Sequence, residues 1–142
     1  MLPPITIISV SKIDLMLLDR FKSNFNNLIN YIDDQDLNSY MNFIVESLFA
    51  ANKYFNDQEP WNKKSDIKRL NTIVYVSLEI IRKISILLYP VIPSSSLKVL
   101  KIFNIQEQDI NLDSIKNHDQ LIVNNKISKI DILFKKINNK ND

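Results

Sequence analysis

The fold is decided by residues 65–93, which read SDIKRLNTIVYVSLEIIRKISILLYPVIP. Ser65 or Asp66 suits the N-cap of a helix, and Pro90 and Pro93 end it, because proline cannot continue a helix. Apolar residues recur between these limits at the three- and four-residue spacing of one helix face: Ile67, Leu70, Val74, Leu78, Ile81, Ile84 and Leu88. The second half is apolar on several faces, so we expect this helix at the centre of a bundle.

Two earlier helices are predicted from the same spacing. The first covers residues 12–32, with an apolar stripe of Ile13, Leu17, Phe21, Phe25, Leu28 and Ile32. Asp33-Asp34 breaks that pattern and can cap a second helix over residues 35–56. The stripe of this second helix is Leu37, Met41, Ile44, Leu48, Ala51 and Phe55.

The remaining segments complete the fold class. Proline and serines predict a short fourth helix over residues 94–103. Residues 1–10 are expected to be an extended lead-in, residues 11–103 the helical bundle, and residues 104–142 an irregular tail. Within the tail, residues 112–117 suit one more helical turn, and residues 127–137 alternate in part like a strand or an extended segment. The sequence therefore predicts a single all-α domain, an antiparallel bundle of four or so helices with a C-terminal tail.

The composition excludes most kinds of catalytic site. The 142 residues contain no glycine, no cysteine and one histidine. Glycine-rich phosphate loops, thiol chemistry and two-histidine metal sites are therefore ruled out. His118 lies in a polar segment and is expected to be exposed and without a function. We expect no catalytic residue, no metal site and no cofactor in this chain.

Charge is unevenly distributed along the chain. Residues 51–106 contain nine basic and four acidic side chains, whereas the net charge of the whole chain is only +2. A basic middle segment suits a polyanionic partner, although a solvated charged surface explains it equally simply. The sequence shows no signal peptide and no membrane span, so a cytoplasmic protein without a membrane partner is expected.

The segment around the only tryptophan is a candidate binding site. Residues 50–61 read AANKYFNDQEPW, and Lys63, Lys64, Lys68 and Arg69 follow closely. An aromatic side chain beside cations suits single-stranded nucleic acid, because bases stack on the ring and cations neutralise phosphates. The alternative is that Trp61 folds into the core beneath the connector.

Five stretches resemble the anticodon-binding domain of methionyl-tRNA synthetases. The resemblance is firm over residues 35–105 and extends more thinly to residue 137; it is carried by ANKYFNDQEPW at 51–61, YVSLEIIR at 75–82, LLYPVIP at 87–93, LKVLKIFNI at 97–105 and LFKKI at 133–137. The resemblance implies that Trp61 stacks on a base of the CAU anticodon and that Asn52, Lys53 and Asn56 lie beside that base. The family commonly has an acid at the position of Asn56 and arginine at that of Lys53. The lysines, with Arg69, would then contact tRNA phosphates.

The resemblance also implies a division of labour. The family charges methionine onto its tRNA with ATP, and the catalytic domain that does so is not in this sequence. The family's first anticodon-domain helix is also missing, which predicts an open apolar face on the bundle. We therefore expect a binding fragment whose partners are methionine-specific tRNA and a separate catalytic domain. The alternatives are a stand-alone RNA-binding remnant that acts in trans and a purely structural helical interaction module.

Overall fold

The computed structural model describes residues 10–118, and within this range the protein consists of α-helices and 3₁₀ turns with no strand. The all-α prediction is therefore confirmed. The α-helices are α1 (Lys12–Ser23), α2 (Phe25–Asp33), α3 (Leu37–Gln58), α4 (Ile67–Leu88) and α5 (Pro93–Ile102). The 3₁₀ turns are η1 (Pro60–Asn62), η2 (Glu107–Asp109) and η3 (Leu112–Lys116).

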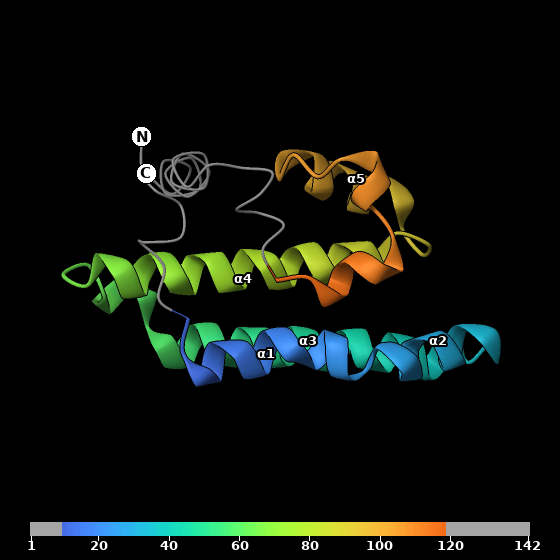
Figure 1. Ribbon diagram of the computed structural model, residues 1–142, viewed down its shortest axis with the longest axis horizontal. Helices are drawn as coiled ribbons and strands as arrows, with labels where there is room; N and C mark the ends of the chain where they lie inside the picture. Colours follow the sequence, from blue (N-terminus) through green and yellow to red (C-terminus); the bar gives the residue numbers. More distant parts are fainter. Residues whose placement is uncertain (1–9, 119–142) are drawn as a thin grey trace.

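The predicted first helix is two helices, because Asn24 interrupts it. Asn24 has φ of -100° and ψ of 9°, outside the helical range, and its side chain donates a hydrogen bond of 2.8 Å to the Arg20 carbonyl, which also accepts from the backbone N–H of Asn24 at 3.2 Å. Helix α2 then begins at Phe25 and continues the course of α1 (Figure 1). The prediction of one continuous helix over residues 12–32 was therefore wrong, although nearly all of these residues are helical.

The caps of the later helices are only partly those predicted. Asp36, rather than Asp33-Asp34, caps α3, and its carboxylate accepts from the backbone N–H of Ser39 at 3.1 Å. Asp66 caps α4 as predicted, by accepting from the backbone N–H of Arg69 at 3.1 Å. Helix α5 begins at Pro93, and the predicted helical turn near residue 112 is η3. The strand or extended segment predicted for residues 127–137 lies outside the described residues.

Helix α4 lies at the centre, as predicted. Helices α1, α2 and α3 lie along one side of α4 and α5 lies on the other, and the segment that follows α5 returns so that η3 contacts both α4 and α1 (Figure 1). Every residue of α4 from Arg82 to Leu87 is buried. The connector between α3 and α4 is at one end of the bundle, and the turn between α2 and α3 is at the other.

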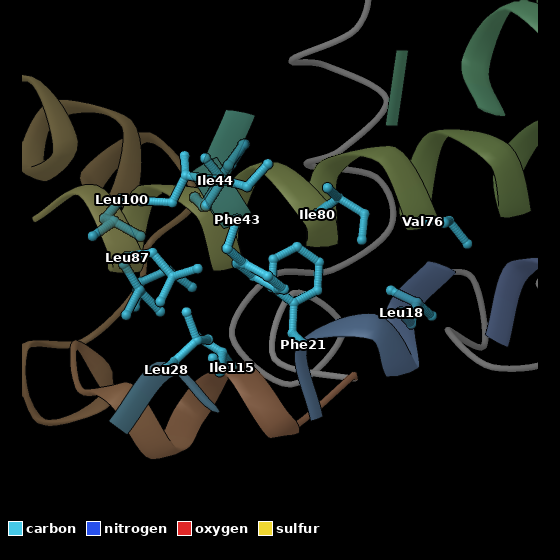
Figure 2. Packing of buried hydrophobic residues seen from close by; sticks show 14 of the residues in the cluster. Leu18, Phe21, Leu28, Phe43, Ile44, Val76, Ile80, Leu87, Leu100 and Ile115 are labelled. Carbon is cyan, nitrogen blue, oxygen red and sulfur yellow. The ribbon is translucent and has the colours of Figure 1, made fainter. Parts of the chain in front are cut away.

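The core uses a face of α3 that overlaps the predicted stripe only in part: Ile44 is buried and Met41, Ala51 and Phe55 pack against the core. The buried residues of α3 are Tyr40, Phe43, Ile44, Ser47 and Tyr54. Figure 2 shows Phe43 and Ile44 among the packed side chains, which come from all the helices that surround α4.

The error in the predicted stripes recurs on three helices. Leu37 and Leu48 of the predicted α3 stripe are exposed. On α4, Ile67 and Ile81 are exposed, and on α1 so is Ile13. Only some members of each predicted stripe therefore reach the core.

Helix α3 presents an exposed apolar surface, which we call the outer stripe of α3 and which consists of Leu37, Val45, Leu48 and Phe49. Phe49 is the most exposed of these, at 69%. An apolar surface of this kind is typical of a contact with another helix or chain. The expected open apolar face is thus present. No helix among residues 10–118 has both the length and the apolar content needed to cross a bilayer.

The outer stripe predicts self-association at high concentration. Leu48→Gln combined with Phe49→Gln should suppress it, because the substitutions remove apolar area that association would bury. Sedimentation of the unaltered chain should give a mass that rises above 16.6 kDa with concentration, whereas the double variant should stay monomeric. Ile102→Gln, at an exposed apolar position on α5, is the matched control and should associate like the unaltered chain. A monomer at every concentration would contradict the prediction.

Candidate nucleic-acid interface

The connector between α3 and α4 is a defined turn. Glu59 ends α3 in the left-handed conformation, with φ of 48°, and Pro60 is buried as the first residue of η1. The backbone N–H groups of Asn62 and Lys63 donate to the carbonyls of Glu59 and Pro60 at 2.9 and 3.1 Å. These bonds and the fixed φ of proline leave the backbone around Trp61 little freedom.

Trp61 is exposed at the tip of this connector. Its side chain is 53% exposed, and its ring lies 6.2 Å from that of Phe55, centroid to centroid, at an angle of 57°. The alternative that Trp61 is a core residue is therefore wrong, because Pro60 takes the buried position beside it. Trp61 is supported by one aromatic ring and leaves much of its own surface accessible to a ligand.

The polar candidates on α3 lie on two sides of the helix. Asn52 and Asn56 are exposed, one turn apart, and Asn52 lies one turn before Phe55. Asn52 is therefore on the side of α3 that carries Phe55. Asn56, roughly 100° from Phe55, lies between the Phe55 and Lys53 sides. Lys53 is two positions from Phe55, roughly 200° around the helix. It forms an ion pair of 2.6 Å with Asp57 and lines a groove of about 400 Å³ between α3 and α1.

The basic candidates after Trp61 divide into three exposed lysines and one enclosed arginine. Lys64 and Lys68 are exposed and Lys63 is partly exposed, and across residues 10–118 none of the three forms an ion pair. The side chain of Arg69 is only 19% exposed and forms an ion pair with Asp14. Both of its terminal nitrogens are therefore occupied within the protein, and the phosphate contact predicted for Arg69 stays a prediction.

Asp14 of α1 is the partner that holds Arg69. Its carboxylate is fully buried and accepts from Nη1 and Nη2 of Arg69 at 2.7 and 2.9 Å. The hydroxyl of Tyr54 donates to it at 2.6 Å, and the backbone N–H and hydroxyl of Ser11 donate at 2.8 and 3.0 Å. Arg69 Nη2 also donates to Gln58 Oε1 at 2.7 Å. One carboxylate thus joins the beginning of α1, the end of α3 and the beginning of α4.

These contacts determine how the groups of the cluster titrate. Burial opposes ionisation of Asp14, but the hydrogen bonds from Arg69, Tyr54 and Ser11 outweigh it and lower the pKa of the carboxyl to about 2. Burial and then the hydrogen bond to Asp14 raise the pKa of Tyr54 well above its ordinary value. Asp14 is therefore a carboxylate, and Tyr54 a neutral donor, throughout the neutral range.

Comparison with known proteins identifies the family. A family model described as the anticodon binding domain of methionyl tRNA ligase matches residues 9–142. The chain belongs to this family. The resemblance read from the sequence motifs is thereby confirmed.

Individual methionine–tRNA ligases match this anticodon-binding domain. The enzyme of Thermotoga maritima is 30% identical over 129 residues, which are 89% of this chain and 20% of that protein. The enzyme of Brucella suis is 36% identical over 93 residues, covering 65% of this chain and 18% of that protein. The enzyme of Pyrococcus horikoshii is 28% identical over 131 residues, covering 90% and 17%. The chain therefore spans about a fifth or less of the length of these relatives.

Sequence reasoning missed two parts of the site in this anticodon-binding domain. Phe55 was predicted as a core residue, whereas it is only partly buried and supports Trp61. Asp14 was passed over, although its spacing to Leu18 and Phe21 places it on the buried face of α1. A single acid in such a buried stripe is the signal that could have revealed the contact, because a buried carboxylate requires a partner.

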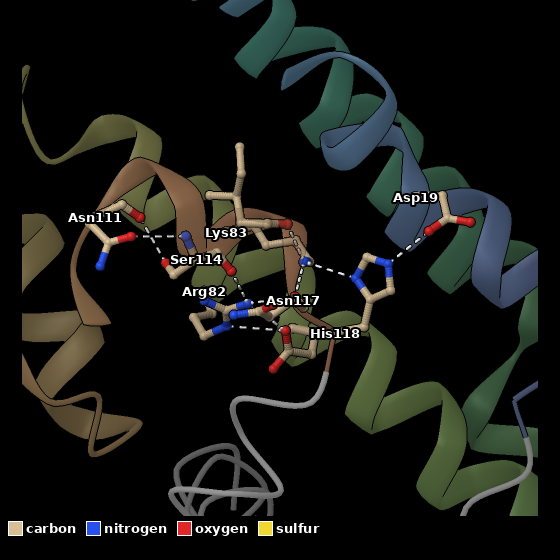
Figure 3. A network of polar contacts seen from close by, with 9 residues as sticks. Asp19, Arg82, Lys83, Asn111, Ser114, Asn117 and His118 are labelled. Carbon is tan, nitrogen blue, oxygen red and sulfur yellow. Dashed lines mark hydrogen bonds and ion pairs between the residues drawn. The ribbon is translucent and has the colours of Figure 1, made fainter. Parts of the chain in front are cut away.

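A second polar cluster binds the segment after η2 to α4. Arg82 donates to Glu79 at 2.8 Å and to the carbonyls of Ser114 and Asn117 at 3.1 and 2.9 Å (Figure 3). Lys83 Nζ donates to the carbonyls of Ile115, at 2.5 Å, and Asn117. These bonds tie backbone carbonyls of the irregular segment to two buried cations of α4, so the cluster is structural.

His118 belongs to this cluster and is not exposed as predicted. It is partly buried, and its ring nitrogens lie 3.1 Å from Lys83 Nζ and 2.7 Å from Asp19 Oδ1. An ammonium group can only donate, so Nδ1 accepts from Lys83 and Nε2 carries the hydrogen that faces Asp19. No three metal-ligating side chains gather anywhere in the described part of the chain.

The lowered pKa of Asp14 predicts acid sensitivity. A carboxyl whose pKa is lower in the folded state stabilises the fold above its unfolded pKa, and that contribution is lost as the pH falls through the folded value. Asp14→Asn should destabilise the domain at pH 7 by about 3 kcal/mol, the scale for breaking a mostly buried ion pair. It should also flatten the fall in stability between about pH 5 and pH 2.

Urea unfolding at a series of pH values measures both effects. Asp113→Asn, at a carboxylate whose side chain is 78% exposed on η3, is the matched control and should leave the neutral stability nearly unchanged. An Asp14→Asn variant with the same acid dependence as the unaltered domain would show that Asp14 is not the group responsible.

Proposed function

We propose that this chain binds the anticodon stem-loop of methionine-specific tRNA and that Trp61 stacks on a base of the CAU anticodon. The observation that carries this proposal is the exposure of Trp61 on a fixed turn, supported by Phe55. A half-exposed indole held in one place offers an accessible aromatic face, and each base offers a flat surface for stacking on it.

The surrounding residues supply recognition and charge in the proposed complex. Asn52, on the Phe55 side of α3, and Asn56, one turn further along, are exposed, and amides can pair with base edges. Lys63, Lys64 and Lys68 follow Trp61 and are not engaged in ion pairs within residues 10–118, so they suit backbone phosphates. We also assign Lys53 to the contact with the anticodon loop. A phosphate of the RNA would compete there with Asp57 for the ammonium group of Lys53.

In this proposal, the joining of methionine to tRNA is carried out by a catalytic domain outside this chain. The relatives are named methionine–tRNA ligases, and a ligase of that kind joins methionine to tRNA with ATP. We assign to this chain the binding and positioning of tRNA, with the ATP site in a catalytic domain outside it, in the cytoplasm. The exposure of Trp61 favours this function over a purely structural module, for which a buried tryptophan was expected.

Substitution of Trp61 tests the stacking. Trp61→Ala should weaken binding of a CAU stem-loop by about 1–3 kcal/mol, and Trp61→Phe should retain part of the affinity because a smaller ring remains. Fluorescein-labelled stem-loops with CAU or scrambled loops, at one salt concentration, give the affinities and their ratio.

The matched control for Trp61 lies at the other end of the bundle. Tyr89 is partly exposed directly after α4, roughly 30 Å along the helix from the connector, and Tyr89→Ala should leave the affinity unchanged. Quenching of Trp61 fluorescence by the CAU loop is the direct signal of stacking. An affinity that Trp61→Ala does not change would contradict the proposed site.

The lysines should act on affinity without affecting selectivity. Lys63→Gln and Lys64→Gln should weaken CAU and scrambled loops about equally, because phosphate contacts carry no sequence information. Each should also reduce the slope of log affinity against log salt by about 0.7 if it contacts one phosphate of a single strand. Lys98→Gln and Lys101→Gln on α5 are the matched charge controls. A lysine substitution that alters the CAU-to-scrambled ratio would point to base recognition instead.

A further inference from the structure

Three helix ends that meet at one buried carboxylate form the base of the Trp61 connector. Ser11 and Asp14 belong to the beginning of α1, Tyr54 to the last turn but one of α3, and Arg69 to the first turn of α4. Asp14 accepts hydrogen bonds from all three of the others, and the longest measures 3.0 Å. Displacement of any of these helix ends would therefore break a bond to a buried charge, which is costly.

The two ends of the connector are also bridged directly. Gln58 is the last residue of α3, and its Oε1 accepts from Nη2 of Arg69, which stands at the third position of α4. The guanidinium is planar and contacts Asp14 with two parallel bonds, so it fixes an orientation as well as a distance. The two helix ends that flank the segment from Glu59 to Asp66 are thus joined by a side-chain hydrogen bond.

The support of Trp61 is adjacent to this base. Tyr54 points into the core, where its hydroxyl reaches Asp14, whereas the next residue, Phe55, packs on Trp61. The two rings are on consecutive residues of a helix, so a rotation of α3 that moved Tyr54 would also move Phe55. The position of the indole is thereby coupled to the contact between Tyr54 and Asp14.

Stability alone does not explain this choice of residues. Replacing a buried ion pair by apolar side chains of similar size is often neutral or stabilising, so such a pair is weak evidence for a stabilising role. What the cluster provides in this place is a fixed geometry for the connector. A ligand that stacks on Trp61 then binds a side chain that is already ordered and loses less entropy in doing so.

We propose that Asp14, Arg69 and Tyr54 are positioning residues for RNA binding, which hold the connector so that Trp61 is ordered for stacking before the ligand arrives. The proposal rests on the proposed function, because it assigns a role to residues that do not touch the RNA. It predicts that loss of the Tyr54 hydroxyl changes the order of the Trp61 side chain and lowers the affinity for RNA, in addition to any effect on the stability of the fold.

The chain contains a matched pair of tyrosines for the test. Tyr54 and Tyr40 are both buried on α3, at 6% and 5% exposure, and each donates one hydrogen bond, of 2.6 Å to Asp14 and 2.5 Å to the carbonyl of Leu87. Tyr54→Phe and Tyr40→Phe each remove one hydroxyl and keep the ring. Binding of a labelled CAU stem-loop is measured at a temperature where both variants are fully folded by circular dichroism.

The expected result separates the two tyrosines. Tyr54→Phe should weaken RNA binding about fivefold, lower the fluorescence anisotropy of Trp61 in the free protein and increase its quenching by iodide. Tyr40→Phe should lower the melting temperature without any of these effects. On a Trp61→Ala background the loss caused by Tyr54→Phe should disappear, because the platform that it positions is gone.

Each contrary outcome has a separate meaning. If Trp61→Ala does not weaken RNA binding, the proposed function fails. If Trp61→Ala weakens binding but Tyr54→Phe behaves like Tyr40→Phe, the function stands and the positioning role is wrong. An equal loss from Tyr54→Phe with and without Trp61 also overturns the positioning role. If Tyr54→Phe does not fold, Arg69→Lys replaces it, since it keeps the charge and loses the paired geometry.

Discussion

Helix α4 has no side that faces solvent from Arg82 to Leu87, and the rest of the described bundle is arranged around this constraint. Helices α1, α3 and α5 and the turn η3 all pack against α4. A helix enclosed in this way must satisfy each of its polar side chains internally. Glu79 and Arg82 therefore pair with each other, and Arg82 and Lys83 bind the backbone carbonyls of residues 114–117. The irregular segment is held to the bundle by the polar groups that α4 could not expose.

The helices could be predicted from the sequence, but their buried faces only in part. The ends of α4 follow from Asp66 and the two prolines, which act locally. The buried face of α3 includes Tyr40, Ser47 and Tyr54, whose side chains carry hydroxyl groups and therefore do not count as apolar in a periodicity pattern. Their hydroxyls are acceptable in the core because they reach partners far along the chain, such as Leu87 and Asp14. A pattern that counts only apolar residues misses part of the buried face when the core contains such pairs.

The candidate site shows the same limit. The motif placed Trp61 and the lysines in one connector, and the structure keeps them there. Whether Trp61 or Pro60 is buried depends on the left-handed turn at Glu59, which a sequence without glycine does not announce. The role of Arg69 could not be predicted either, because its partner Asp14 lies 55 positions away. Local chemistry was therefore predictable, and contacts between distant segments were not.

The arginines of the described chain, like the buried Lys83, make contacts within the fold, whereas the lysines that follow Trp61 do not form ion pairs within residues 10–118. The sequence contains three arginines, and each forms an internal contact: Arg20 with Ser47 at 2.8 Å, Arg69 with Asp14, and Arg82 with Glu79. A guanidinium can satisfy several acceptors in fixed directions, which suits the interior, whereas an ammonium group on a flexible stem suits a phosphate chain in solvent. If the arginines hold the fold, the charges left for RNA are lysines, which attract any strand alike. Selectivity for one anticodon must then come from Trp61 and the neighbouring asparagines. The precision with which the fold holds Trp61 therefore matters more here than it would in a site that reads bases with arginine.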